Sequence, residues 1–261
     1  MLLDTGKVDI DSKDNEGRIP LLYTAGSGHK EVVKIFLDTG KVDIDSKDNG
    51  GRTPLSYAAG IEDEAVSKPS STQERLTSTR RITTAGRHIL YAARSGHEAI
   101  VKMLLDTGKV DIDSKDNEGR IPLLYTAGSG HKEVVKIFLD TGKVDIDSKD
   151  NGGRTPLSYA AGIEDEAKWT QAVVKVLLDT GKVDIDLKDN FGRTPLSYAA
   201  WSGHEAVIKM LLGTGKVDIN SKDENGKAPL WYAAASRYEA VVKMLHDSHP
   251  TLRMTLPHVL P

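Results

Sequence analysis

The chain has 261 residues, with 35 Lys and Arg against 38 Asp and Glu, a formal net charge of −3 and no cysteine. The balanced charge lacks the basic footprint of a nucleic-acid-binding protein, and the absence of cysteine excludes a disulfide framework and a thiolate metal site. The N-terminal MLLDTGKVDIDSKD has no apolar signal segment, and no later stretch approaches the ~18 apolar residues of a membrane span. We therefore expect neither secretion nor membrane insertion.

A twelve-residue segment, DTGKVDIDSKDN, occurs four times without change, and two near-copies follow it. The six segments start at Asp4, Asp38, Asp106, Asp140, Asp179 and Gly213. Successive starts are therefore separated by 34, 68, 34, 39 and 34 residues, which is a period with one doubled and one stretched step. A fixed period of this length predicts an array of stacked units without a single central core.

The unit at residues 189–222 shows what each repeat contains. Thr194 followed by Pro195 predicts a helix start, because the threonine hydroxyl can accept from a free backbone N–H and proline has none to leave unpaired. Gly203 predicts the end of this helix. A second helix is expected from about His204, followed by an extended, hairpin-like loop. Each helix is too short to persist alone in water, so the units must stack.

Several segments of this unit resemble the ankyrin repeat: G-R-T-P-L-S-Y-A-A, then S-G-H-E-A-V, K-M-L-L and G-K-V-D-I-N. The resemblance implies an all-α, ankyrin-type α-solenoid of helix-turn-helix repeats joined by extended hairpin-like loops. Two features depart from the family. Ser56, Ser158 and Ser197 stand where the family's T-P-L-H motif has histidine, so the expected Thr–His hydrogen bond is unavailable, and the period of 34 is one residue longer than the family's 33.

The array is expected to be interrupted. Residues 1–65 read as N-terminal repeats, the first of them truncated, and residues 66–88 as an aberrant linker rich in Ser, Thr and Arg. Residues 89–246 read as C-terminal repeats and 247–261 as an irregular tail. In this interpretation the doubled step holds two separate units, at residues 48–65 and 83–115.

Residues 1–65 are identical to residues 103–167, which indicates a recent duplication. The chain starts within a repeat, so we expect a fragment of a longer array. In the stretched unit, the segment GIEDEAKWTQ is inserted between the two helices, and it is expected to place Trp169 on an exposed bulge.

Four histidines, His29, His97, His131 and His204, occupy the same S-G-H position. Ligands of one metal ion must converge on it, whereas equivalent positions in stacked helix pairs are about 10 Å apart. We therefore expect these histidines to serve in packing or in loop hydrogen bonds.

Other motifs for chemistry fail at specific positions. The D-x-D-x-x-D-N run has Lys13 where a calcium loop needs an oxygen ligand. The T-G-K triplet lacks the Ser or Thr that follows it in a phosphate loop, and there is no G-x-S-x-G elbow. The sequence therefore predicts no catalytic residue, no cofactor and no metal site, and we expect the chain not to be an enzyme.

Seven of the eight tyrosines occupy one repeat position: Tyr23, Tyr57, Tyr91, Tyr125, Tyr159, Tyr198 and Tyr232. This spacing favours a half-buried packing ladder. The alternative is a platform on which nucleic-acid bases stack, but the chain has no basic groove to accompany it.

The remaining interpretation is recognition of a protein partner. The resemblance implies a concave surface lined by loop tips and first helices, where positions that vary between repeats carry specificity. Phe191, Arg193 and Trp201 bring residue types of interface hot spots into one unit. The alternative is that Trp201 and Trp231 only fill gaps between repeats. The predicted partner-binding residues are Arg120, Arg154, Trp169, Phe191, Arg193, Trp201 and Trp231.

We therefore expect a monomeric, non-catalytic protein–protein interaction module that binds neither nucleic acid nor membrane. Its lack of cysteine fits a reducing compartment, so an intracellular, cytoplasmic location is expected, with the nucleus as an alternative. A second function, implied by the resemblance, is the detached C-terminal sensor or regulatory array of a larger nucleotide-hydrolysing switch or receptor protein. A third is a mechanical spacer.

Overall fold

The computed structural model describes residues 9–59, 97–162 and 167–248, and within these ranges it contains α-helices and no β-strand. The all-α fold class expected from the sequence is therefore confirmed. The chain divides into two compact units, residues 1–144 and 145–261, each described by itself below. No helix in the described ranges is long and apolar enough to cross a membrane.

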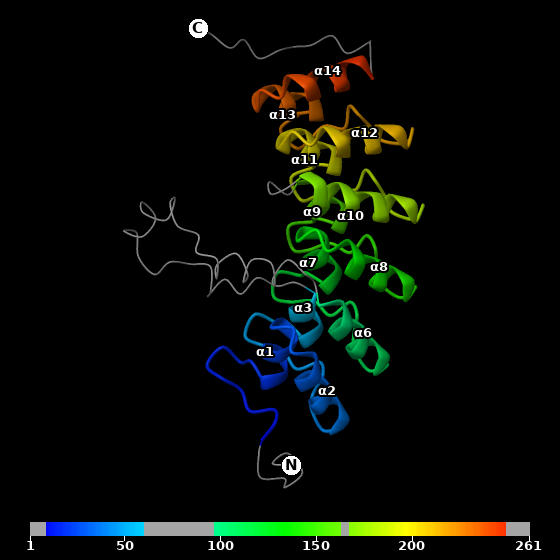
Figure 1. Cartoon of the computed structure of the whole chain (residues 1–261). Coiled ribbons are helices and arrows are strands. Elements are labelled where there is room, and N and C mark those ends of the chain that lie inside the picture. Colours follow the sequence, from blue (N-terminus) through cyan, green and yellow to red (C-terminus); the bar gives the residue numbers. More distant parts are fainter. Residues whose placement is uncertain (1–8, 60–96, 163–166, 249–261) are drawn as a thin grey trace, which may run out of the picture. The chain divides into compact units, whose positions relative to one another are not determined.

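The first unit consists of short helix pairs that stack on one another (Figure 1). The helices are α1 (Pro20–Gly26), α2 (Lys30–Asp38), α3 (Pro54–Ala58), α6 (Glu98–Asp106), α7 (Pro122–Gly128) and α8 (Lys132–Asp140). First helices contact first helices, as α1 contacts α3 and α3 contacts α7. Second helices do the same, because α6 contacts both α2 and α8.

The pair formed by α3 and α6 joins two parts of the chain that flank residues 60–96. The backbone N–H of His97 donates to the carbonyl of Ala58 over 3.1 Å, as the N–H of His29 donates to Thr24 over 3.0 Å between α1 and α2. His97 follows Ala58 by 39 residues, whereas His29 follows Thr24 by 5. The chain between α3 and α6 is therefore longer by 34 residues, one repeat length, than the chain between α1 and α2.

α3 and α6 therefore pack together as a helix pair. The separate units predicted at residues 48–65 and 83–115 fall in large part on residues 60–96, which lie outside the described residues. The adjoining loops agree, because the backbone N–H of Asn117 donates to the carbonyl of Gly50 over 2.8 Å. The linker predicted at residues 66–88 lies outside the described residues. The same holds for the predicted tail beyond residue 248.

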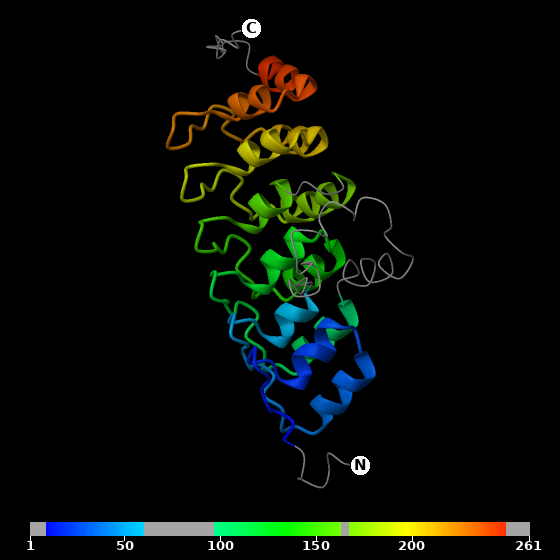
Figure 2. The same cartoon turned by 90° about the vertical axis from the view of Figure 1, so that its left-hand side faces the viewer.

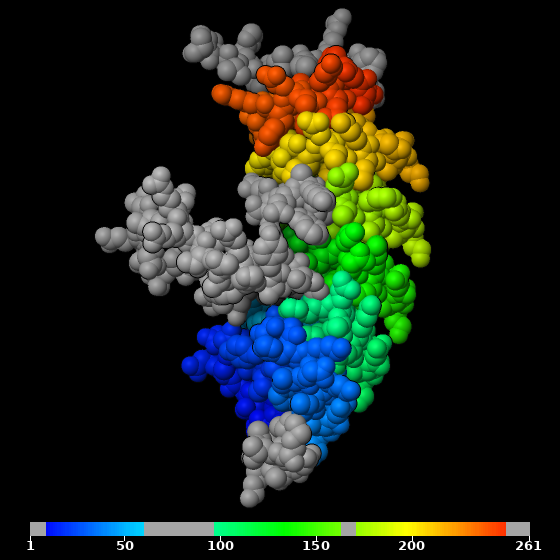
Figure 3. Space-filling view, in the orientation of Figure 1, coloured from blue at the N-terminus to red at the C-terminus, as the bar shows by residue number. Residues whose placement is uncertain are grey.

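The second unit repeats the same architecture. Its helices are α9 (Pro156–Gly162), α10 (Ala167–Asp179), α11 (Pro195–Ser202), α12 (Glu205–Gly213), α13 (Pro229–Ala235) and α14 (Glu239–Asp247). Figure 2 shows its loops projecting from one side of the helices. In the space-filling view of Figure 3, α13 and α14 (orange to red) pack directly on α11 and α12 (yellow).

Residue Trp169 lies within α10, which has 13 residues, whereas the second helices α12 and α14 have nine. The predicted bulge around Trp169 is therefore wrong. Part of the inserted segment extends the second helix at its N-terminal end, because continued i to i−4 hydrogen bonding satisfies backbone groups that a bulge would leave unpaired.

Proline begins the first helices, and a threonine caps α3, α9 and α11, as predicted for Thr194. In α1, α7 and α13 the N-cap residue is Ile19, Ile121 or Ala228, without a side-chain hydrogen bond. In α11, the Thr194 hydroxyl accepts from the backbone N–H of Ser197 over 3.3 Å, and the two hydroxyls lie 3.2 Å apart in a capping box. Thr53 and Ser56 form the same hydroxyl contact at 3.2 Å. Serine therefore takes over the hydrogen bond with threonine that the sequence comparison suggested was lost. Gly203, with a φ of 73°, ends α11 as predicted.

Histidines at the S-G-H position join successive repeats. The Nε2 atom of His97 lies 2.9 Å from the carbonyl of Gly26, and the Nδ1 atom of His204 lies 3.1 Å from the carbonyl of Ala161. Burial lowers the pKa of His204, which keeps its ring neutral. The structural role predicted for these two histidines is therefore confirmed.

Candidate functional site

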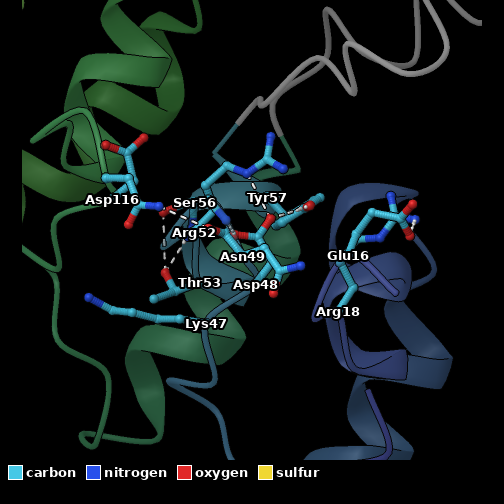
Figure 4. A network of polar contacts seen from close by, with 12 residues as sticks. Glu16, Arg18, Lys47, Asp48, Asn49, Arg52, Thr53, Ser56, Tyr57 and Asp116 are labelled. Atoms are coloured by element: carbon cyan, nitrogen blue, oxygen red, sulfur yellow. Dashed lines mark hydrogen bonds and ion pairs between the residues drawn. The ribbon is translucent and has the colours of Figure 1, made fainter. Parts of the chain in front are cut away.

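An aspartate at the start of each loop organises the surface formed by the loops and first helices. One carboxylate oxygen of Asp48 accepts from the backbone N–H groups of Gly50 and Arg52, at 2.9 and 2.8 Å. The other accepts from the Arg52 Nε atom at 2.7 Å and from the Tyr57 hydroxyl at 2.8 Å (Figure 4). The guanidinium of Arg52 also lies over the Tyr57 ring, 5.4 Å from its centre. The loop is therefore rigidly attached to its own first helix.

The same contacts recur through the array, with the Arg four residues and the Tyr nine residues after the Asp. The equivalent trios are Asp14, Arg18 and Tyr23; Asp116, Arg120 and Tyr125; Asp150, Arg154 and Tyr159; and Asp189, Arg193 and Tyr198. Five tyrosines of the row are buried or half-buried, as a packing ladder predicts: Tyr57, Tyr125, Tyr159, Tyr198 and Tyr232. Tyr23 is exposed, and Tyr91 lies outside the described residues. The hydroxyls of the described tyrosines also donate to aspartate, a role that the sequence interpretation missed although the nine-residue spacing was visible.

The predicted partner-binding arginines Arg120 and Arg154 belong to these trios. Their guanidinium groups are committed to Asp116 and Asp150, so their first role is to hold the loops. Part of each side chain stays accessible, with 29% of Arg120 and 43% of Arg154 exposed. Contact of either residue with a partner stays a prediction.

The repeat at residues 189–222 adds two large exposed rings to its trio. The Arg193 guanidinium lies 4.8 Å from the ring centre of Phe191, 4.9 Å from that of Tyr198 and 5.9 Å from that of Trp201. Phe191 is 57% exposed and Trp201 is 48% exposed. Three aromatic rings therefore surround one guanidinium, which is itself fixed by Asp189.

The following repeat continues this group of rings. Trp201 stacks on Tyr232 with ring centres 5.8 Å apart, and Tyr232 meets Trp231 edge to face at 5.4 Å. The ammonium of Lys227 lies 3.8 Å from the ring centre of Trp231. We call this set the aromatic cluster; its members are Phe191, Arg193, Tyr198, Trp201, Lys227, Trp231 and Tyr232.

The carboxylates beside the cluster are hydrogen-bonded, whereas the Lys227 ammonium is directed to an aromatic ring. Burial opposes ionisation of Asp189, yet hydrogen bonds from Tyr198 and Arg193 lower its pKa below the ordinary value. Burial and the hydrogen bond to Asp223 raise the pKa of Tyr232 to about 12. Lys227 replaces the arginine of the other repeats, and its ammonium makes no hydrogen bond or ion pair among the described residues.

The structure brings together four of the seven predicted partner-binding residues: Phe191, Arg193, Trp201 and Trp231. The side chain of Trp169 lies outside the described part of the structure. Tyr198, Tyr232 and Lys227 were not predicted as site residues. The sequence did contain an indication of Lys227, because the other repeats have arginine at this position, four residues after the loop aspartate.

A family model described as ankyrin repeats in three copies matches residues 1–67, 89–169 and 167–254. The chain belongs to the ankyrin repeat family. Ankyrin repeats generally mediate protein–protein interactions, which agrees with a surface of ordered loops and exposed rings. A search of curated protein sequences gave no match to this chain.

The acidic side chains of this ankyrin surface are engaged in hydrogen bonds that hold its loops. Across residues 9–59, 97–162 and 167–248, no three His, Asp or Glu side chains are grouped so that they could hold a metal ion. The aspartates at the loop starts already accept three or four hydrogen bonds each, and Asp189 has a lowered pKa. Such a carboxylate is a weak proton acceptor, so the arrangement suits recognition.

Proposed function

We propose that the chain is a non-catalytic module that binds a protein partner through the aromatic cluster. The observation that supports this most directly is the exposure of Phe191 and Trp201 beside the guanidinium of Arg193. Large apolar side chains are usually buried, and aromatic and arginine residues dominate the binding energy of protein interfaces. The cluster occupies the loop tips and first helices, the surface that is concave in ankyrin arrays.

The exposed rings are not needed to build a repeat. The position of Phe191 is occupied by Glu or Gly in the earlier repeats, and the position of Trp201 is Gly in the first repeat and Ala in the last. Both rings are held in place by the Arg193 guanidinium and, for Trp201, by the ring of Tyr232. Their ordering before binding reduces the entropy that a complex must lose.

The charges indicate the chemistry of the partner. Phe191 and Trp201 offer apolar surface, and Lys227 offers an ammonium that forms no ion pair among the described residues. A peptide segment with an apolar side chain next to Asp or Glu satisfies both. The carboxylate would meet Lys227 beside an aromatic face, where partial desolvation strengthens the ion pair.

The proposal can be tested with a random peptide library displayed on phage and selected on the full 261-residue chain. We expect enriched peptides to combine an aromatic or aliphatic residue with Asp or Glu. The double variant Phe191→Glu, Trp201→Gly carries the residues of the first repeat, Glu16 and Gly26, at these positions. In isothermal titration calorimetry we expect this variant to bind the enriched peptide at least about tenfold more weakly. This is a loss of ~1.4 kcal/mol in binding free energy.

Two further variants separate the contributions. Lys227→Gln should weaken binding and reduce its dependence on salt, because it removes the free cation. Lys209→Gln, on the exposed side of α12, is the matched control and should leave affinity unchanged. Equal affinity of the wild type and the double variant for every selected peptide would contradict the proposal.

A further inference from the structure

Three asparagines of the chain are followed directly by glycine: Asn49, Asn151 and Asn225. This dipeptide is chemically labile, because glycine has no side chain to shield its own backbone nitrogen, and that nitrogen can attack the side chain of the asparagine. Asn49 and Asn151 stand directly after the loop aspartate, whereas Asn225 stands two residues after Asp223. The three sites therefore share one dipeptide but occupy two different places in the loop.

The site at Asn49 is held by hydrogen bonds. The Asn49 side-chain amide donates to the carbonyl of Asn15 over 3.0 Å, and its backbone N–H donates to the carbonyl of Glu16 over 2.8 Å. The N–H of Gly50 donates to the carboxylate of Asp48 over 2.9 Å, a charge-assisted bond that is stronger than a neutral one. The same carboxylate opposes loss of a proton from the Gly50 nitrogen, because a second negative charge would form beside it.

The site at Asn225 has different surroundings. Asn225 is exposed, and its side chain makes no hydrogen bond among the described residues. Its backbone N–H donates to the carboxylate of Asp223 over 2.8 Å, so the N–H of Gly226 donates instead to the neutral backbone carbonyl of Asp223, over 2.9 Å. The Asn225 side chain can therefore turn toward Gly226, whose nitrogen is held by the weaker kind of hydrogen bond.

The exposure of Asn225 is a property of its position in the repeat. The residues at the same position in interior repeats are exposed as well, with 57% of Phe191 and 64% of the Glu118 side chain accessible. Both of these repeats are followed by another repeat within the described residues. A further repeat stacked after the last one would therefore leave the Asn225 side chain accessible.

A carboxylate at this position pairs with the cation two residues later. In the first repeat, Glu16 forms an ion pair with Arg18 at 2.7 Å. The same two positions of the last repeat hold Asn225 and Lys227. The Lys227 ammonium lies 3.8 Å from the ring centre of Trp231 and forms no ion pair among the described residues. Conversion of Asn225 to a carboxylate would give the last repeat the charge pair of the first.

We propose that Asn225 is a site of spontaneous deamidation, and that the carboxylate formed there pairs with Lys227. The Gly226 nitrogen loses its proton to water or hydroxide and attacks the side-chain carbonyl carbon of Asn225. A C–N bond forms, and the side-chain nitrogen leaves as ammonia. Water then opens the resulting cyclic imide at either carbonyl carbon, which yields aspartate or isoaspartate. The net reaction consumes water, releases ammonia and oxidises nothing.

The effect on the aromatic cluster rests on the proposed function, whereas the chemical step does not. In the proposed complex, the Lys227 ammonium meets a carboxylate of the partner. A carboxylate at residue 225 competes for the same ammonium and repels the acidic partner. Deamidated chains should therefore bind acidic peptides more weakly than fresh chains.

The test of the chemistry is to age the full chain at mildly alkaline pH and to follow each Asn-Gly site by mass spectrometry of proteolytic peptides. The peptides around Asn49 and Asn151 are identical in sequence, so they are measured together as the matched control. We expect Asn225 to change from amide to carboxyl at least about tenfold faster, because the control site must first break its side-chain hydrogen bond. The rate should rise with pH, because the Gly226 nitrogen has to lose a proton. Equal rates, or a faster reaction at the control sites, would overturn the proposal.

The substitution Asn225→Asp tests the consequence separately. In NMR, the ammonium protons of Lys227 should exchange with water several-fold more slowly in Asn225→Asp than in Asn225→Gln, because an ion pair protects them. Equal exchange in the two variants would overturn the pairing with Lys227. The acidic peptide selected by phage display should also bind Asn225→Asp several-fold more weakly than Asn225→Gln. Slower exchange together with a peptide affinity that is the same in both variants would support the ion pair and count against the proposed role of Lys227 in binding.

Discussion

The first repeat and its copy at α7 and α8 have one sequence but two environments. Both form helices with the same bounds, at Pro20–Gly26 and Lys30–Asp38 and at Pro122–Gly128 and Lys132–Asp140. In the copy, Val134 and Thr126 are buried by the preceding repeat, while Val32 and Thr24 are not. The loop aspartates differ in the same way, because the side chain of Asp116 is fully buried and that of Asp14 is 30% exposed.

This difference separates local from neighbour-dependent stability. The proline starts and the glycine turns depend on the repeat's own residues and are shared by both copies. Burial of apolar and polar groups depends on the next repeat and is not shared. In an array of this kind, stability is a sum of repeat terms and interface terms, and the two copies differ only in the interface term.

The largest expected effect comes from placing a charge at the buried valine. Val134→Asp puts a carboxylate into a covered apolar site and should reduce the free energy of unfolding by about 3 kcal/mol or more. Val32→Asp makes the same change at an exposed site and should cost no more than about 0.5 kcal/mol. Both residues occupy the same position in their helices, so propensity and helix-dipole effects cancel between them.

Urea unfolding followed by circular dichroism measures this difference, at a concentration low enough to keep the chain monomeric. Equal destabilisation by the two substitutions would show that the preceding repeat does not cover α8.

A smaller effect is expected at the tyrosine hydroxyls. Tyr125→Phe removes the donor to the buried carboxylate of Asp116 and should cost about 1–2 kcal/mol. Tyr23→Phe removes the donor to Asp14, where water can replace it, and should cost about 0.5 kcal/mol or less. The same urea experiment distinguishes the two. A larger loss in Tyr23→Phe would mean that Asp14 is better shielded from water than its exposure indicates.

The sequence predicted what depends on short-range chemistry. The helix start at Thr194 and Pro195, the helix end at Gly203 and the structural role of His204 follow from interactions within a few residues or from the repeat period. The pairing of α3 with α6 did not follow, because two segments before α6, TPLSYAA at residues 53–59 and HILYAA at residues 88–93, both have the pattern of a first helix. The period alone cannot rank them.

The candidate site was predicted in part for the same reason. Phe191 and Trp201 stand out because they replace small or polar residues at repeat positions. Their contacts with Arg193, Tyr198 and Tyr232 depend on side-chain geometry across two repeats. The sequence also treated Arg120 and Arg154 as available for a partner, although a carboxylate four residues earlier was a visible sign that each was already paired.

The smallest expected effect concerns Arg237, at the other end of the array. Its φ is 61°, at the position where Gly203 has a φ of 73°. A side chain at Gly203 would also meet the ring of Tyr238 in the next repeat at 2.7 Å, whereas Arg237 has no following repeat within the described residues. Arg237 therefore bears only the backbone strain. Arg237→Gly should stabilise the dilute chain by about 1 kcal/mol in urea unfolding, and Arg237→Ala, which keeps the strain, should not.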